Sequence, residues 1–277
     1  MKALTLFIAI FIIACTNGPA PPTDFSYPLN AGNHWEYRRT IQITNIRPDS
    51  LKEQFMMADT FYIEVTVGDL VTLKNNLSAV PIIAKTSQRN DSLFSINFYQ
   101  QDASGLFQVA YLPAHFVPGL PKTNRLQFRF KGRTYASLQN LSDALSGYYP
   151  DVLSMRSDSL IFYDPPRPIL SYPLFIGKRW DLANDSFRIE KYITDYGPIN
   201  LPAGDFEAFT IRWLYYFDGK DTPDEDLALF EYISKKGLLK RRIQALNGIL
   251  TTQTGDELGY FDYYENLELV SYDVAAK

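Results

Sequence analysis

The sequence predicts a mostly β protein built from antiparallel strands. Apolar and polar residues alternate along several segments, and Gly-, Asp- and Asn-containing turns separate these segments. No long amphipathic helix and no regular succession of strands and helices is present. A parallel α/β fold is therefore not expected.

The alternation is clearest at the first predicted strand. Trp35, Tyr37, Ile41 and Ile43 fall on one face. The other face carries the polar residues His34, Glu36, Arg38, Thr40 and Gln42. The same period of two recurs in residues 61–67, 94–98, 126–130 and 209–217. One short helix is expected near residues 138–146, where Gly147 would end it.

An internal repeat organises the chain. Residues 26–37 align without a gap to residues 171–182, and the Ser, Tyr, Pro, Leu, Gly and Trp of the two segments are identical. The matched pairs include Gly32 with Gly177 and Trp35 with Trp180. Two further matches follow in the same order, residues 71–80 with 199–209 and residues 98–107 with 230–239. We therefore predict a tandem duplication.

The first β repeat is expected to span residues 25–163, with an insertion at about 111–160, and the second to span residues 170–277. Residues 164–169 contain three prolines, which disfavour any regular element, so they are predicted to be a joint. The repeats are expected to form two small curved sheets or half-barrels, or one merged sandwich. Trp180 is expected in the core, where Trp180→Ala would cost about 3–5 kcal/mol.

The N-terminal segment has the pattern of an export signal. Residues 1–14 contain one early positive charge and a short apolar run, and Cys15 follows as the only cysteine. Residues 12–15, Ile-Ile-Ala-Cys, resemble the lipobox of bacterial lipoproteins. The resemblance implies that residues 1–14 are a signal peptide and that Cys15 carries lipid. A membrane-spanning helix would need about 20 apolar residues, more than this run provides.

Residues 15–24 are then expected to be the lipidated end and a flexible tether, since they are polar and rich in Gly and Pro. The lipoprotein resemblance implies a cell-envelope location, with the membrane as a partner through the N-terminal lipid. Thr16 stands where aspartate would resemble an inner-membrane retention signal, which favours the outer membrane. No acidic run follows Cys15, which favours the periplasmic face.

A second resemblance concerns the repeat unit. Its Tyr-Pro-Leu-x-x-Gly-x-x-Trp opening, the Leu-Pro-Ala-Gly-x-Phe turn at residues 201–206 and Gly-Leu-Leu-Lys at residues 237–240 look like a group of uncharacterised bacterial envelope lipoproteins. The similarity covers most of residues 171–245. The first copy departs from the pattern at residues 74–76. The resemblance implies a domain type and no assigned activity.

Composition limits the partners. The chain has 27 basic and 31 acidic residues and a net charge of −4, so nucleic acid is not expected as a partner. An apolar content of 46% with 15% aromatic residues predicts a packed core. A lipid on the single cysteine leaves none for a disulfide.

No catalytic pattern is visible. His34 and His115 lack the spacing of a zinc site, and a Gly-x-Ser-x-Gly element is absent. His34 is expected at the surface. The local acidic cluster is a calcium candidate, although a solvated hairpin loop is the favoured interpretation; its aspartates are Asp218, Asp221, Asp224 and Asp226. No metal and no cofactor are expected.

The aromatic residues leave two interpretations open. Tyr and Phe number 19 each, and they form either ordinary sheet core or a cupped face that holds an apolar or glycan ligand. Leu214 and Tyr216 lie opposite the core-facing Trp213 and Tyr215, so they would need a cover or a ligand. We expect a non-enzymatic binding or assembly module with such a ligand or an envelope protein partner. The alternative is a hydrolase acting on envelope polymers or glycans.

Overall fold

The computed structural model describes residues 20–54, 58–88, 91–112, 126–146, 160–184, 188–217 and 219–275. Most of these residues join one antiparallel sheet, so the prediction of a mostly β fold is confirmed. Cys15 lies outside the described residues, as do the expected signal peptide and most of the expected tether. None of the helices in the described ranges has the length and hydrophobicity needed to span a bilayer.

Two sets of strands follow each other along the chain. The first set comprises β1 (His34–Arg47), β2 (Ala58–Val67), β3 (Val71–Thr72), β4 (Ser78–Gln88), β5 (Asp91–Asp102), β6 (Gly105–Leu112) and β9 (Ile161–Ser171). The second set comprises β10 (Arg179–Asn184), β11 (Arg188–Leu201), β12 (Gly204–Tyr216), β13 (Leu227–Ser234), β14 (Gly237–Thr252) and β15 (Glu257–Asp273). Two 3-10 turns, Asp49–Gln54 and Lys74–Asn76, lie in the connections of the first set.

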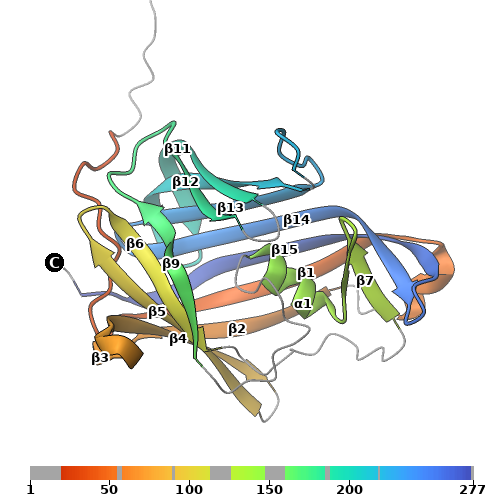
Figure 1. Ribbon diagram of the computed structural model, residues 1–277, viewed down its shortest axis with the longest axis horizontal. Coiled ribbons are helices and arrows are strands. Elements are labelled where there is room, and N and C mark those ends of the chain that lie inside the picture. Colours follow the sequence, from red (N-terminus) through yellow and green to blue (C-terminus); the bar gives the residue numbers. More distant parts are fainter. Residues whose placement is uncertain are drawn as a thin grey trace, which may run out of the picture.

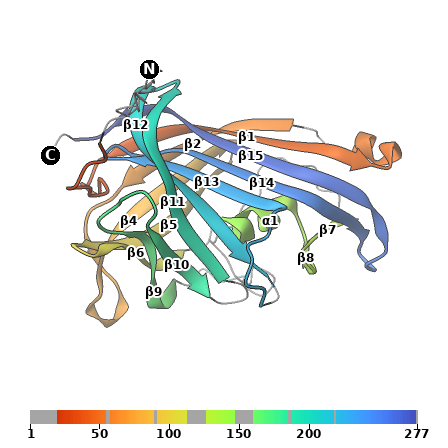
Figure 2. The same cartoon turned by 90° about the horizontal axis from the view of Figure 1, so that it is seen from above.

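Apart from β3, which pairs with β4 beside the path, these strands follow the order β10-β11-β12-β13-β14-β15-β1-β2-β4-β5-β6-β9. The last strand of the chain, β15, pairs with the first, β1, so the two sets merge into one curved sheet. The long strands β14, β15 and β1 lie side by side along the molecule (Figures 1 and 2). Of the arrangements expected from the sequence, the merged one is therefore present, as a continuous sheet.

The proline-rich joint is part of a strand. Residues 164–168 lie within β9, so the prediction that the prolines interrupt regular structure is wrong. The physical reason is that β9 ends the hydrogen-bonded path and tolerates residues without an N–H group. Its pairing with β6 is irregular, with register shifts at Leu106/Phe107 and Gln108/Ala110.

The two ends of the path, β9 and β10, approach each other and nearly close the sheet. Side chains bridge this seam: Trp180 Nε1 donates to the Pro168 carbonyl at 2.8 Å, and Lys191 Nζ donates to the Ile169 carbonyl at 3.1 Å. Trp180 is consequently only half-buried, although it packs against the main core. Trp35, its counterpart in the predicted first repeat, is fully buried.

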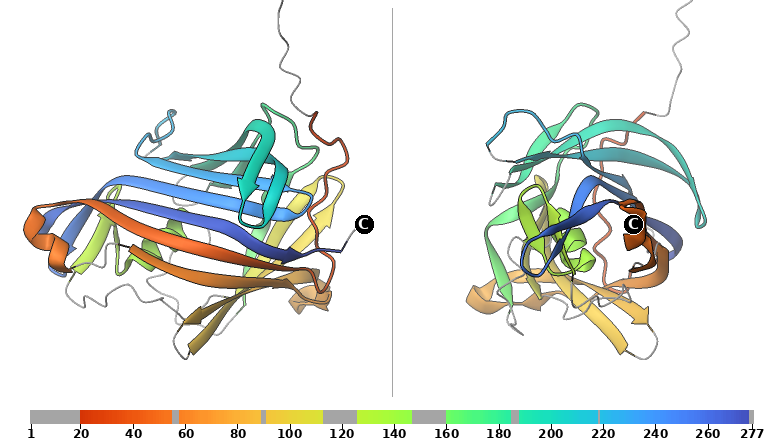
Figure 3. Two further views of the ribbon diagram at one scale, coloured as in Figure 1. Left: turned by 180° about the vertical axis from the view of Figure 1, so that it is seen from behind. Right: turned by 90° about the vertical axis from the view of Figure 1, so that its right-hand side faces the viewer.

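The segment between β6 and β9, which the sequence predicts to be an insertion, packs inside the curve of the sheet in its described part. Its described part contains β7 (Leu126–Phe130), β8 (Arg133–Tyr135) and α1 (Leu138–Leu145), which confirms the predicted short helix. Ser137 caps α1 by accepting a hydrogen bond from the Asn140 backbone N–H. The right-hand view in Figure 3 shows the sheet curving around these elements. The concave face is therefore occupied by the chain's own residues.

Aromatic side chains line this interior. Two rings of β12 and the ring of Phe217, the next residue after this strand, form a stack. The centroid distances are 6.3 Å for Trp213 and Tyr215 and 6.4 Å for Tyr215 and Phe217. All three are buried in the main core cluster, together with the three leucines of α1. In this region the aromatic residues form sheet core, as one of the two interpretations proposed.

Candidate functional site

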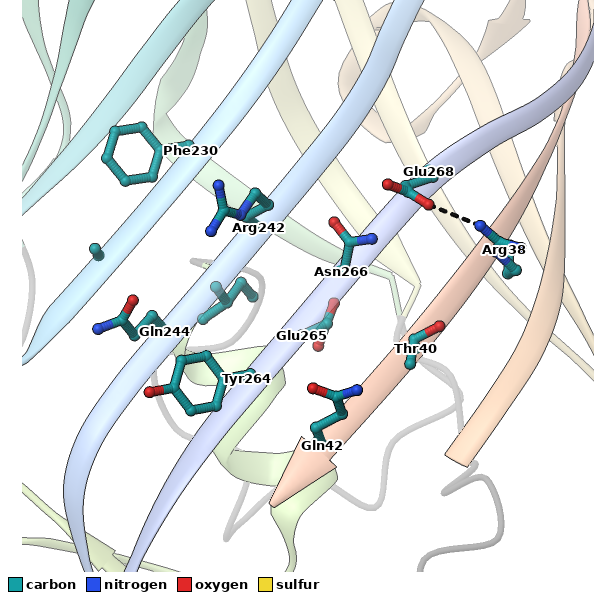
Figure 4. A pocket seen from close by; sticks show the side chains of 12 residues that line it. Arg38, Thr40, Gln42, Phe230, Arg242, Gln244, Tyr264, Glu265, Asn266 and Glu268 are labelled. Atoms are coloured by element: carbon teal, nitrogen blue, oxygen red, sulfur yellow. Dashed lines mark hydrogen bonds and ion pairs between the residues drawn. The ribbon is translucent and has the colours of Figure 1, made fainter. Parts of the chain in front are cut away.

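A groove of about 330 Å³ crosses the outer, convex face of β13, β14, β15 and β1 (Figure 4). It lies on the side of the sheet opposite to α1. Its lining residues are Arg38, Thr40, Gln42, Ala228, Phe230, Arg242, Ile243, Gln244, Tyr264, Glu265, Asn266 and Glu268. We call this site the outer groove.

Strand alternation selects the side chains that face the outer groove. On β15, Tyr264, Asn266 and Glu268 are partly exposed, whereas Glu265 and Leu267 are buried on the opposite face. Cα pairing places Arg242 beside Asn266, and Asn266 beside Thr40. Three carboxamides, two arginines and two aromatic rings thus share one surface.

Several polar groups in the outer groove have no hydrogen-bond partner among the described residues. The side chains of Gln42, Gln244 and Tyr264 form no hydrogen bond with other described residues. Asn266 Oδ1 is buried and accepts no hydrogen bond within the same ranges. Because a buried acceptor without a donor is costly, this oxygen is suited to a hydroxyl or amide donor from a ligand.

One edge of the outer groove carries an ion-pair cluster. Glu268 accepts from Arg38 at 2.9 Å and from Lys240 at 2.7 Å. Burial acts to raise the pKa of Glu268, but hydrogen bonds from Lys240, Asn266 and Arg38 outweigh it and lower the pKa to about 2. Glu268 is therefore ionised at neutral pH and acts as an acceptor.

A second charged cluster lies behind the groove, on the concave face. Glu265 accepts hydrogen bonds from Arg39 at 2.7 Å, Ser142 of α1 at 2.7 Å and Tyr263 at 2.7 Å. Arg241 approaches its other oxygen at 3.3 Å. This cluster ties α1 to β1, β14 and β15.

Burial also acts to raise the pKa of Glu265, yet the positive charges of Arg39 and Arg241 and the accepted hydrogen bonds lower it to about 2. The two carboxylates of this region, Glu265 and Glu268, are thus both held ionised. A glycosidase needs one carboxylic acid that stays protonated near its working pH. Neither residue fits that role.

A further buried pair continues the concave cluster towards the seam. Lys191 Nζ lies 2.9 Å from Glu231 Oε2, and Trp213 Nε1 donates to the same oxygen at 2.9 Å. Burial lowers the pKa of Lys191, while the charge of Glu231 opposes this shift. Together these contacts satisfy the buried charges and identify a structural role for them.

The second apolar face expected around Leu214 and Tyr216 has a cover from the chain itself. Both residues are buried. The Arg188 guanidinium lies 4.8 Å from the centre of the Tyr216 ring, and Arg188 also pairs with Glu190 at 2.9 Å. Charged side chains therefore shield this part of the convex face.

The acidic loop after β12 is tied to the β7–β8 hairpin. Lys131 Nζ lies 2.9 Å from Asp224 and 2.6 Å from Asp226, so one cation serves both carboxylates. Asp221 is exposed, and Asp218 lies outside the described residues. Across the ranges that the structure describes, no three His, Cys, Asp or Glu side chains group to hold a metal ion.

Strand alternation predicts a polar face for Arg38, Thr40 and Gln42 but assigns them no site. The missing signal was register, because alternation gives the face of a residue but not its neighbours on other strands. His34 is half-buried at the start of β1, away from the outer groove. His115 lies outside the described residues.

No protein-family model and no curated protein matches the chain. Two solved structures are similar to it over most of its length. One is a proposed lipoprotein from Parabacteroides distasonis, with 8% identity over 89% of this chain and 97% of that chain and a TM-score of 0.30. The other is a proposed exported protein with a YmcC-like fold from Bacteroides fragilis, with 9% identity over 89% and 98% and a TM-score of 0.28. A likeness at this level assigns neither a family nor an activity.

Proposed function

We propose that the chain is a lipid-anchored envelope protein that binds a glycan in the outer groove without catalysing a reaction on it. The observation that carries the proposal is the set of uncommitted groups on one surface: Gln42, Gln244, Tyr264 and the Asn266 oxygen. Carboxamides and hydroxyls match the alternating donors and acceptors of sugar hydroxyls. Phe230 and Tyr264 add flat apolar surface for a sugar ring.

The concave side does not favour a lipid carrier. Its aromatic residues are packed against one another and against α1. A hydrolase is less well supported than a binding module, because the lowered pKa values of Glu265 and Glu268 leave neither as a proton donor.

Anchoring by Cys15, at the outer membrane and facing the periplasm, rests on the lipobox resemblance. The first described residues run along one end of the sheet, where Asp24 pairs with Lys235 at 2.7 Å. The C-terminal end of β15 lies at the same end, since the Ala275 N–H donates to Asn33 Oδ1 at 3.1 Å (Figure 1). An N-terminal lipid would hold the molecule by this end and leave the outer groove accessible on its side.

Binding is tested with soluble polysaccharides in native affinity gels, using dextran, mannan and polygalacturonate as probes and the full exported chain with Cys15→Ser. At least one probe is expected to retard the protein. Tyr264→Ala should weaken that retardation about tenfold, as expected for loss of one well-packed aromatic contact. Tyr260→Ala is the matched control, because Tyr260 is an exposed tyrosine on the same strand that does not line the groove. Equal effects of the two substitutions, or no retardation by any probe, would contradict the proposal.

Anchoring is tested separately by labelling growing bacteria with radioactive palmitate. The wild-type chain should incorporate label and fractionate with the outer membrane, whereas Cys15→Ser should do neither. A labelled chain in the inner membrane would overturn the outer-membrane assignment alone. An unlabelled wild-type chain would overturn the anchor.

A further inference from the structure

One row of directly opposed residues runs across five neighbouring strands of the second set. Cα pairing places Arg179 of β10 beside Tyr192 of β11, Tyr192 beside Arg212 of β12, Arg212 beside Phe230 of β13, and Phe230 beside Arg242 of β14. Directly opposed residues share a face of the sheet. The row therefore alternates arginine and aromatic side chains along the convex face.

The row leads into the outer groove. Phe230 and Arg242 line that groove, and Figure 4 shows them followed by Asn266 and Thr40 on the next two strands. Pairing of Arg242 with Asn266 and of Asn266 with Thr40 continues the same line. The groove is thus one end of a longer track that crosses the strands.

The side chains of the row form two cation–π pairs. The Arg179 guanidinium lies 4.1 Å from the centre of the Tyr192 ring, and the Arg212 guanidinium lies 5.9 Å from that of Phe230. Stacking on a ring orients a guanidinium while leaving its N–H groups free to bind anions.

The charges in the middle of the track are not neutralised locally. Among the described residues, neither Arg212 nor Arg242 forms an ion pair, and the buried Arg212 Nε donates no hydrogen bond. Arg179 differs, because it is paired with Glu190 at 2.6 Å. Two unpaired cations flanking one aromatic ring are suited to an anionic ligand with a flat sugar or base between its charges.

From this geometry we infer that the ligand of the outer groove is an acidic polysaccharide, laid across the strands from β1 towards β10. The inference rests on the proposed glycan-binding function and specifies the chemical class of the ligand. Strands lie about 4.8 Å apart, so arginines on alternate strands recur about every 10 Å. Two linked sugar rings span a similar distance, so one ring can rest on Phe230 while carboxylates or sulfates of its neighbours reach Arg212 and Arg242.

The test compares polygalacturonate with its methyl-esterified form, which keeps the sugar chain and removes its charge. Calorimetric titration of the exported chain carrying Cys15→Ser should show at least tenfold tighter binding of the charged form, and this preference should shrink as salt is added. The triple variant R179Q/R212Q/R242Q should lose the preference. Lys85→Gln is the matched control for the single variant Arg242→Gln, since it removes one exposed positive charge from β4, outside the track.

Arg242 is exposed, so Arg242→Gln alone provides the test if the triple variant does not fold. It should lower affinity for polygalacturonate about tenfold and leave affinity for the esterified form within twofold. Equal binding of both forms by the wild-type chain would overturn the acidic ligand while leaving glycan binding intact. Binding of neither form, nor of dextran or mannan, would overturn glycan binding itself. Tighter binding of single-stranded oligo(dT) than of polygalacturonate would overturn the inference in favour of nucleic acid.

Discussion

The two halves of the sheet share a framework of turns. In the first half the Gly32 N–H donates to Val67 O at 2.9 Å, and the Val67 N–H donates back to Asn33 O at 2.9 Å. In the second half Gly177 and Lys178 make the same pair of bonds with Ile193, at 2.9 and 3.0 Å. These matched bonds support the proposed tandem duplication.

The chemistry of the convex face differs between the halves. The row that starts at Arg179 has a counterpart that starts at His34 and crosses β1, β2, β4, β5 and β6. Its members are His34, Thr66, Ile83, Ile96 and Leu112. This counterpart contains no arginine and no large aromatic ring. The framework therefore does not require the arginine–aromatic row, which supports a role for it in binding.

The two matched tryptophans, Trp35 and Trp180, should differ most in what their removal costs. Trp35 is fully buried, and its Nε1 donates to the Lys236 carbonyl at 2.6 Å, so Trp35→Ala should lower the free energy of unfolding by about 3–5 kcal/mol. Trp180→Ala should lower the free energy of unfolding by less than half of this amount, because Trp180 lies half-buried at the seam. Urea denaturation of both variants gives the two values. Equal losses would contradict the difference in burial.

The second test concerns the strand pair β1–β15, which joins the two halves of the sheet. Here Arg39 of β1 pairs with Glu265 of β15. Glu265→Gln should destabilise the protein by about 3 kcal/mol at neutral pH, because two buried guanidinium groups lose their anion. A lowered pKa stabilises the folded state above the ordinary value of 4.5, and this contribution is lost as pH falls towards 2.

Urea midpoints measured from pH 7 to pH 2 provide the check. The wild-type chain should lose stability over this range more steeply than Glu265→Gln, which lacks the titrating group. Parallel curves for the two proteins would show that Glu265 does not have a lowered pKa.

The smallest expected effects concern the matched glycines. Gly32 and Gly177 have φ angles of +86° and +93°, and a Cβ at either position would meet no atom within 4 Å. Gly32→Ala and Gly177→Ala should therefore each cost about 1 kcal/mol, from backbone strain alone. Thermal unfolding should show similar shifts for both. A much larger shift for one of them would show that the two turns are not equivalent.

Much of the fold was accessible from the sequence because period-two patterns and turn residues are local signals. The strand at β1, the hairpin strand β7 and the helix α1 are examples. The strand through Asp164–Pro168 was not accessible, because its place at the end of the sheet depends on β6 and β10. The three prolines disfavour a strand locally, but the position of these residues at the end of the sheet allows one.

The candidate site was harder to predict. In the charged cluster behind the outer groove, Arg39 falls on the core face of β1 by alternation. Its partner Glu265 is 226 residues away, and no local pattern pairs them. The arginine–aromatic row is also invisible in the sequence, because its members are spread over residues 179–242 and are united only by register. What was predicted correctly is the polar character of the outer face of β1.

The proline-rich strand at the seam has a consequence for how molecules of this protein meet one another. A free strand edge is a template on which a second chain can add a strand. Pro165, Pro166 and Pro168 offer no N–H groups, and the Pro168 and Ile169 carbonyls are already taken by Trp180 and Lys191. Among the residues that the structure describes, the edge of the sheet at β9 therefore resists intermolecular strand pairing. At high local concentration, molecules of this protein would therefore stay separate even though backbone hydrogen bonds do not close the sheet into a ring.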